Sequence, residues 1–163
     1  MFSGYIHLSK ALTNVEVDAC NAAIDTEPSD GGEAGALAAL AEHPVLAQYV
    51  EALCGSGFVL DQPPQLVTQQ DDALSFTPLS PEECRRLRYA TQGDERLCKG
   101  VRVFVALAPS TEAGPVFVPA SHNRTTEPPA DFCSGENEMG MTEQSACEAG
   151  DVLICASTLL YGM

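Results

Sequence analysis

Two stretches of this sequence decide its fold: VRVFVALAPSTEAGPVFVPASHN (residues 101–123) and AGDVLICASTLLYG (residues 149–162). Both are rich in β-branched and aromatic residues, which favour strands. We predict strands over residues 100–110, 114–122 and 150–160. The loop between the first two has the length and composition of a hairpin connection, so we expect these two strands to pair. The third predicted strand, residues 150–160, contains a continuous apolar run, which indicates that it is buried.

The first third of the chain, residues 1–57, is expected to be helical. Thr13 and Glu16 form the pattern of a capping box, in which two side chains accept from each other's free backbone amides, so a helix begins there. Two further helical segments within residues 36–58 are predicted to meet near Pro44. The apolar face of the first helix is predicted from the spacing of Val15, Ala19, Ala22 and Ala23.

Strands are expected to dominate the rest of the chain. Residues 58–70 carry β-forming residues broken by two prolines, which predicts an edge strand. Ser80 and Glu83 repeat the capping-box pattern around a proline, so a short helix is expected there. We therefore predict one α+β domain over residues 1–163, with a helical N-terminal third and mainly strands over residues 58–163.

The chain is strongly acidic, with 23 acidic and 8 basic residues and a net charge of −15. Such a surface repels phosphate backbones and anionic lipids, so neither nucleic acid nor a membrane surface is an expected partner. No stretch approaches the roughly 20 apolar residues of a membrane span. The seven cysteines include no C-x-x-C pair. Scattered single cysteines are typical of core residues in a reducing compartment, so an intracellular location is expected.

The order of short motifs in the two quoted stretches resembles the phytanoyl-CoA dioxygenase (PhyH-like) family. In that family a strand ending in leucine leads through a Gly-Pro turn into a strand that closes on P-G-S-H. Later, G-D opens a strand that ends in H-G. The counterparts here are Leu107, Gly114-Pro115, residues 119–122, Gly150-Asp151 and Tyr161-Gly162. The N-terminal FSGYIHLSKALTNVEVDACNAAID also resembles the opening strand and helix of the family. The resemblance implies a double-stranded β-helix (jelly-roll) core, incomplete at the C-terminus.

The resemblance also implies iron(II)- and 2-oxoglutarate-dependent oxygenase chemistry, which needs two histidines and one carboxylate on the metal. The family supplies an H-x-D motif upstream of the strand at residues 101–107 and the histidine of the closing H-G. Here the matching positions fall near Arg86 and Arg88, or at Tyr89, and Tyr161 replaces the closing histidine. Arginine repels Fe(II), and a phenol with a pKa near 10 is a poor ligand for it. The sequence therefore predicts no catalytic residues, no metal site and no cofactor.

None of the three histidines is followed two residues later by an acid, so none matches the ligand motif. His7 and His43 are interpreted as ordinary structural residues. His122 corresponds to the P-G-S-H histidine, which lies at the mouth of the site in the family and is expected to position a loop by hydrogen bonding. A vestigial pocket is predicted from Arg86, Arg88, Tyr89, Arg102, His122 and Tyr161.

The predicted function is a non-catalytic binding or structural role, a pseudoenzyme serving as a subunit of a larger assembly. A barrel lacking its last strands leaves an unpaired strand edge, so a protein partner is expected to cover it. The alternative is an active Fe(II)/2-oxoglutarate-dependent hydroxylase whose ligands are misaligned or lie outside this chain. A third hypothesis is a small-ligand module holding an anion with Arg85, Arg86, Arg88 and Arg102. Against it, such a cluster is more commonly a solvated helix face.

Overall fold

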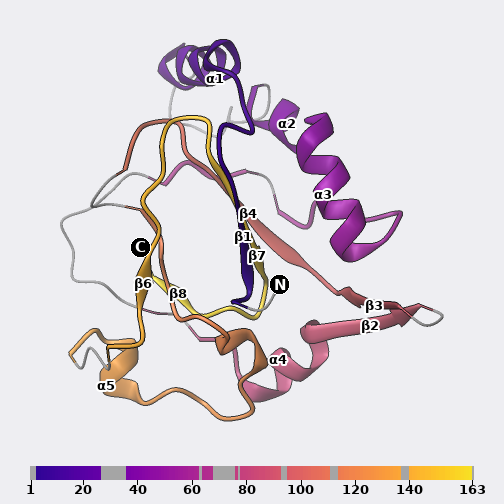
Figure 1. Cartoon of the computed structure of the whole chain (residues 1–163), viewed down its shortest axis with the longest axis vertical. Coiled ribbons are helices and arrows are strands. Elements are labelled where there is room, and N and C mark those ends of the chain that lie inside the picture. Colours follow the sequence, from indigo (N-terminus) through magenta and orange to yellow (C-terminus); the bar gives the residue numbers. More distant parts are fainter. Residues whose placement is uncertain are drawn as a thin grey trace.

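A computed structural model shows a mixed helix and sheet protein and confirms the predicted α+β composition (Figure 1). It describes residues 3–26, 36–62, 64–67, 76, 78–92, 95–110, 114–136 and 140–162. Three N-terminal helices lie on one side of a central sheet, and a second small sheet lies on the other side (Figure 1). Within the described residues, no helix is long and apolar enough to cross a membrane.

Two of the helices begin where capping boxes in the sequence place them. The Thr13 amide donates to Glu16 Oε2 at 2.8 Å and the Glu16 amide donates to Thr13 Oγ1 at 3.4 Å, which confirms the first capping box. Ser80 and Glu83 make the same pair of bonds, at 2.9 and 3.3 Å. The helices are α1 (Asn14–Thr26), α2 (Ala36–Ala41), α3 (Pro44–Cys54), α4 (Pro81–Arg88), α5 (Ala130–Cys133) and the 3-10 turn η1 (Ser121–Asn123).

The predicted apolar face of α1 is wrong. Val15 is 78% exposed, whereas Val17 and Cys20 are buried. Val17 packs with Leu12 and with the central sheet in one core cluster. Small alanines contribute little burial energy, so the larger Val17 decides which side of the helix faces the sheet.

The strands form two three-stranded antiparallel sheets and a hairpin. The central sheet has the order β1-β7-β4 and the second sheet has the order β6-β5-β8. A separate hairpin joins β2 to β3. The strands are β1 (Tyr5–Leu8), β2 (Tyr89–Gln92), β3 (Glu95–Cys98), β4 (Val101–Val105), β5 (Val116–Phe117), β6 (Glu143–Gln144), β7 (Val152–Ala156) and β8 (Tyr161–Gly162).

Two strand predictions are wrong, and a third predicted strand is interrupted by a turn. The expected hairpin does not form, because β4 pairs with β7 whereas β5 pairs with β6 and β8. The chain instead passes from one sheet to the other between β4 and β5. The described parts of residues 58–70 contain no strand. The run at 150–160 is buried as expected, but a turn closed by the Leu159 amide on the Ala156 carbonyl divides it into β7 and the approach to β8.

Strand β7 is the centre of the core because all five of its residues are buried. Its side chains alternate in direction, so Val152 and Ile154 pack against the helical layer. Leu153 and Cys155 point to the second sheet. There they form the inter-sheet cluster, which consists of Phe117, Cys147, Leu153, Cys155 and Leu159. The rings of Tyr5 and Phe104 contact Phe117 with centroids 5.0 and 6.2 Å away, which links the two sheets.

Candidate metal centre

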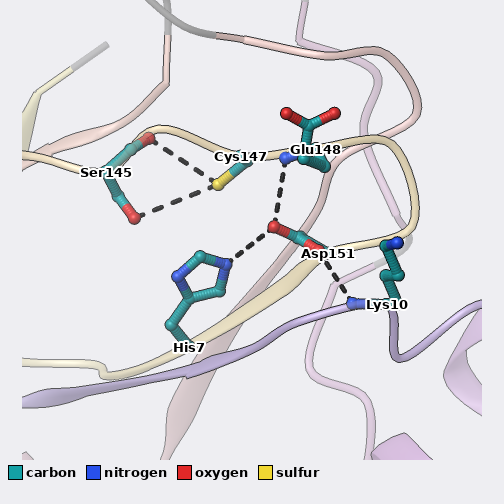
Figure 2. A network of polar contacts seen from close by, with 6 residues as sticks. All are labelled: His7, Lys10, Ser145, Cys147, Glu148 and Asp151. Atoms are coloured by element: carbon teal, nitrogen blue, oxygen red, sulfur yellow. Dashed lines mark hydrogen bonds and ion pairs between the residues drawn. The ribbon is translucent and has the colours of Figure 1, made fainter.

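Three potential metal ligands meet where β7 begins. His7 lies on β1, Asp151 directly precedes β7, and Cys147 lies four residues before Asp151 (Figure 2). The antiparallel register sets His7 opposite Leu153, which brings its side chain next to Asp151. One nitrogen, sulfur or oxygen atom of each residue lies within 4.8 Å of the other two. Pairing of strands that are far apart in sequence therefore assembles this group.

The Asp151 carboxylate is held rigidly. The Lys10 amide donates to Oδ1 at 2.8 Å and the Glu148 amide donates to Oδ2 at 3.0 Å. The His7 Nε2 atom lies 2.9 Å from the same Oδ2 (Figure 2). Burial opposes ionisation, but these two amides and the imidazole outweigh it and lower the pKa of Asp151. The side chain is therefore an oriented anion at neutral pH.

Cys147 supplies a sulfur from the interior side of the group. It is 5% exposed, and its Sγ lies 3.6 Å from the Ser145 carbonyl oxygen. Burial raises the pKa of this thiol, and the charge of Asp151 raises it further, against the lowering effect of the Ser145 hydrogen bond. The thiol is therefore protonated in the metal-free protein. Because thiolates are the metal-binding form, a metal would have to displace this proton.

His7 gives the group its access to solvent. Its side chain is 32% exposed, whereas the side chain of Asp151 is 5% exposed. Figure 2 shows the imidazole reaching from the N-terminal strand toward Asp151. An ion can therefore approach along the imidazole side while the inter-sheet cluster closes the other side.

The donor set fits a divalent transition metal. In a tetrahedral zinc site, bonds of roughly 2.0–2.3 Å place ligand atoms about 3.3–3.8 Å apart. The ligand atoms of this group lie within 4.8 Å of one another, and His7 Nε2 is 2.9 Å from Asp151 Oδ2. An imidazole and a carboxylate are also two of the three ligands in non-haem iron(II) sites, and Cys147 would supply a thiolate as the third ligand. Three protein ligands leave at least one position for water or a substrate.

The predicted pocket residues lie elsewhere. Arg102 and Tyr161 do meet, with the guanidinium carbon 4.4 Å from the centre of the phenol ring. Arg86 is exposed on α4. His122 is buried in η1, where its Nε2 lies 3.0 Å from Asn123 Nδ2. Arg88 and Tyr89 lie outside the described side chains. The structure thus places Arg102 and Tyr161 side by side, and the role of the set stays a prediction.

The same fold occurs in proteins that bind 2-oxoglutarate and a metal. HygX from Streptomyces hygroscopicus with nickel and 2-oxoglutarate bound matches 99% of this chain and 76% of its own, at 18% identity and a TM-score of 0.71. Its complex with nickel, 2-oxoglutarate and hygromycin B gives 17% identity, the same coverage and a TM-score of 0.73. The epimerase SnoN in complex with Fe³⁺, alpha ketoglutarate and nogalamycin RO matches 99% of this chain and 72% of its own, at 19% identity and a TM-score of 0.57. No protein-family model and no curated protein matches the sequence.

These findings correct one expectation. The prediction that the chain takes no cofactor is wrong, because three HygX structures hold nickel or iron, two of them with 2-oxoglutarate, and this chain gathers its own group of potential ligands. His7 lies in that group of potential ligands, and its interpretation as an ordinary structural residue stays a prediction. The likeness shows that the chain shares the fold of HygX and SnoN, while the resemblance to the phytanoyl-CoA dioxygenase family stays a prediction.

Sequence reasoning missed the group because His7 is 140 residues from Cys147 and 144 from Asp151, and the three residues match no ligand motif. The one local signal is the Gly150-Asp151 pair, which contributes to the family resemblance but does not by itself indicate a ligand. Gly150 has a φ of 91°, and a Cβ there would lie 2.6 Å from the Leu12 carbonyl oxygen. Glycine is therefore required for the turn that presents Asp151.

Proposed function

We propose that this chain is a metal-dependent oxygenase domain that uses 2-oxoglutarate, with its two sheets forming the two halves of a jelly roll. The observation that carries the proposal is the group formed by His7, Cys147 and Asp151. It occurs on a fold shared over 99% of the chain with proteins whose structures hold iron or nickel and 2-oxoglutarate. Together these observations favour the alternative function, an active Fe(II)/2-oxoglutarate-dependent hydroxylase, over a pseudoenzyme.

The three side chains would have different tasks toward the metal. Asp151 brings a permanent negative charge in a fixed orientation, because two backbone amides hold its oxygens. His7 supplies a nitrogen on the solvent side, and Cys147 supplies a sulfur on the buried side. When bound, iron(II) supplies the redox chemistry of oxygenases. The inter-sheet cluster behind Cys147 excludes water from that face of the site.

One observation favours a second candidate, a domain that binds metal and ligand without turnover. Tyr161 stands where the family pattern has its closing histidine, and its ring packs against Phe104 with centroids 5.3 Å apart. A phenol packed in this way does not replace an imidazole ligand. In this case the fold serves as a binding module, and the protein partner and intracellular location stay predictions.

Metal binding and turnover distinguish the two candidates. The protein is stripped with chelator and reloaded anaerobically with Fe(II), and retained iron and succinate formed from 2-oxoglutarate are measured. We expect one iron per chain and a loss of iron in His7→Ala and Cys147→Ser. His43→Ala and Cys54→Ser are the matched controls, since neither residue belongs to the group. Iron without succinate supports the binding module. If the protein retains neither Fe(II) nor, after the same reloading with Zn(II), zinc, both candidate functions are refuted.

A further inference from the structure

We propose a ligand site in the helical layer, which goes beyond the metal-dependent function: the cavity between α1, α2 and α3 binds an organic ammonium ion with a small apolar body. The cavity has a volume of about 290 Å³. A water molecule takes about 30 Å³ in the liquid, so this volume accommodates about ten non-hydrogen atoms. The residues that line the cavity are Glu16, Ala19, Cys20, Ala39, Leu40, Glu42, His43 and Pro44.

The cavity and the candidate metal centre have no residue in common. The three helices around the cavity cover the central sheet on the side away from the second sheet (Figure 1). Cys147 of the metal group instead packs in the inter-sheet cluster. Ligand binding in the helical layer therefore does not depend on the proposed metal-dependent function.

Glu16 places a fixed carboxylate on the wall of the cavity. Its Oε2 accepts from the Thr13 amide at 2.8 Å and from the Thr13 hydroxyl at 2.7 Å, and its Oε1 lies 3.1 Å from His43 Nε2. The Thr13 amide, and then the Thr13 hydroxyl, lower the pKa of Glu16, so the side chain is an anion at neutral pH. Because the side chain is also 43% exposed, a ligand can reach this oriented charge.

His43 supplies a second, independent observation. Its Nε2 faces a carboxylate oxygen, so in a neutral imidazole Nε2 carries the proton and Nδ1 is an acceptor. Nδ1 is buried and has no hydrogen-bond partner within the described part of the structure. Buried polar atoms are normally satisfied, so this nitrogen, on a residue that lines a cavity, points to a donor from outside the chain. Because Nδ1 is shielded from solvent, the imidazole has to turn for a ligand to reach it.

The charges on the wall select a cation. Glu16 and Glu42 line the cavity, and no lysine or arginine is among the described residues that do so. An ammonium group has three N–H donors, so it can donate to His43 Nδ1 and pair with Glu16 at the same time. Ala19 and Leu40 offer an apolar wall for the hydrocarbon part of the ligand. The net charge of −15 adds a general attraction for cations, whereas an anionic ligand would be repelled.

The test uses chelator-treated protein, so that its failure and the failure of the proposed function are distinguishable. Benzylamine, benzyl alcohol and benzoate share one ring and differ in the polar group, and their binding is followed by the NMR chemical shifts of the protein amides. We expect benzylamine to bind at least about tenfold more tightly than benzyl alcohol, the equivalent of roughly 1.4 kcal/mol. We expect its shifts to centre on Ala19, Leu40 and His43, and we expect benzoate not to bind.

Three variants locate the binding in the cavity. Glu16→Gln removes the charge but keeps a residue that can complete a capping box, and it is expected to weaken benzylamine at least about tenfold. His43→Ala is expected to weaken it as well. Ala19→Leu narrows the cavity at an exposed position and is expected to abolish binding without unfolding the protein. Glu51→Gln is the matched control, since it removes an exposed carboxylate of α3 outside the cavity and should leave the affinity unchanged.

Thermal unfolding of each variant shows whether it is folded, and Ala19→Leu keeps the test valid if Glu16→Gln is not. No benzylamine binding to the parent overturns the proposal. Equal benzylamine affinity in the parent and in Ala19→Leu overturns the assignment to this cavity. Equal affinity of the parent for benzylamine and benzyl alcohol overturns the assignment to an ammonium ion.

Discussion

Replacing Asp151 by asparagine separates the structural role of this side chain from its proposed metal role. In the parent, Oδ1 accepts from Lys10 and Oδ2 accepts from Glu148, while His7 lies against Oδ2. Asparagine has one carbonyl oxygen, so in either orientation its NH₂ group faces a backbone amide. One buried N–H donor then loses its acceptor, and the negative charge is lost.

The size of the effect follows from these bonds. An unsatisfied buried donor and a lost charge-assisted bond together are expected to lower the free energy of unfolding by about 2–4 kcal/mol. For a chain of this length that corresponds to a fall in Tm of roughly 4–16 °C. The assay is thermal and urea unfolding of chelator-treated protein. Glu148→Gln is the matched control, because its side chain is exposed and its backbone amide still donates to Asp151.

A further comparison isolates the metal. His7→Ala removes one partner of Asp151 but leaves both backbone amides satisfied, so in the absence of metal it is expected to cost less than Asp151→Asn. With metal added, both variants are expected to lose the stabilisation that the parent gains from binding. An Asp151→Asn variant as stable as Glu148→Gln in chelator would refute the argument that these bonds fix the carboxylate.

Three further predictions concern the fold. Phe117→Ala removes the ring between the two sheets and should cost about 3–5 kcal/mol in urea unfolding, whereas Val15→Ala on the surface should change stability by less than about 0.5 kcal/mol; equal costs would contradict the core assignment. Gly150→Ala should destabilise more than Gly57→Ala in thermal unfolding, because both glycines have positive φ but only the first would bring a Cβ against backbone; the reverse order would be inconsistent with the close approach of Gly150 to Leu12. The pKa of Glu16 is lowered by the Thr13 amide and then by its hydroxyl, so its stabilisation is present above the ordinary value of 4.5 and is lost as pH falls through the lower folded pKa; urea unfolding of Glu16→Gln should lack this pH dependence, and an unchanged profile would exclude the capping box as its source.

Local sequence signals determined where helices α1, α3 and α4 begin. The capping boxes at Thr13 and Ser80 and the break at Pro44 each depend on residues within three or four positions of one another. Such interactions are set by backbone geometry before any tertiary contact forms, so they can be read directly from the chain. The β-branched composition likewise identified β4, β5 and β7 as strands.

Tertiary structure decided which strands pair and which side chains meet. Composition makes β4 and β5 look like a hairpin, but the burial of Phe117 against Tyr5 and Phe104 sets them in different sheets. The antiparallel pairing of β1 with β7 likewise carries His7 to Asp151. The candidate metal centre has no local motif, because antiparallel register brings His7 to Asp151 and Cys147 from a distant part of the sequence. That register is chosen by burying β7 on both faces, which is a property of the whole core and not of any one stretch of sequence.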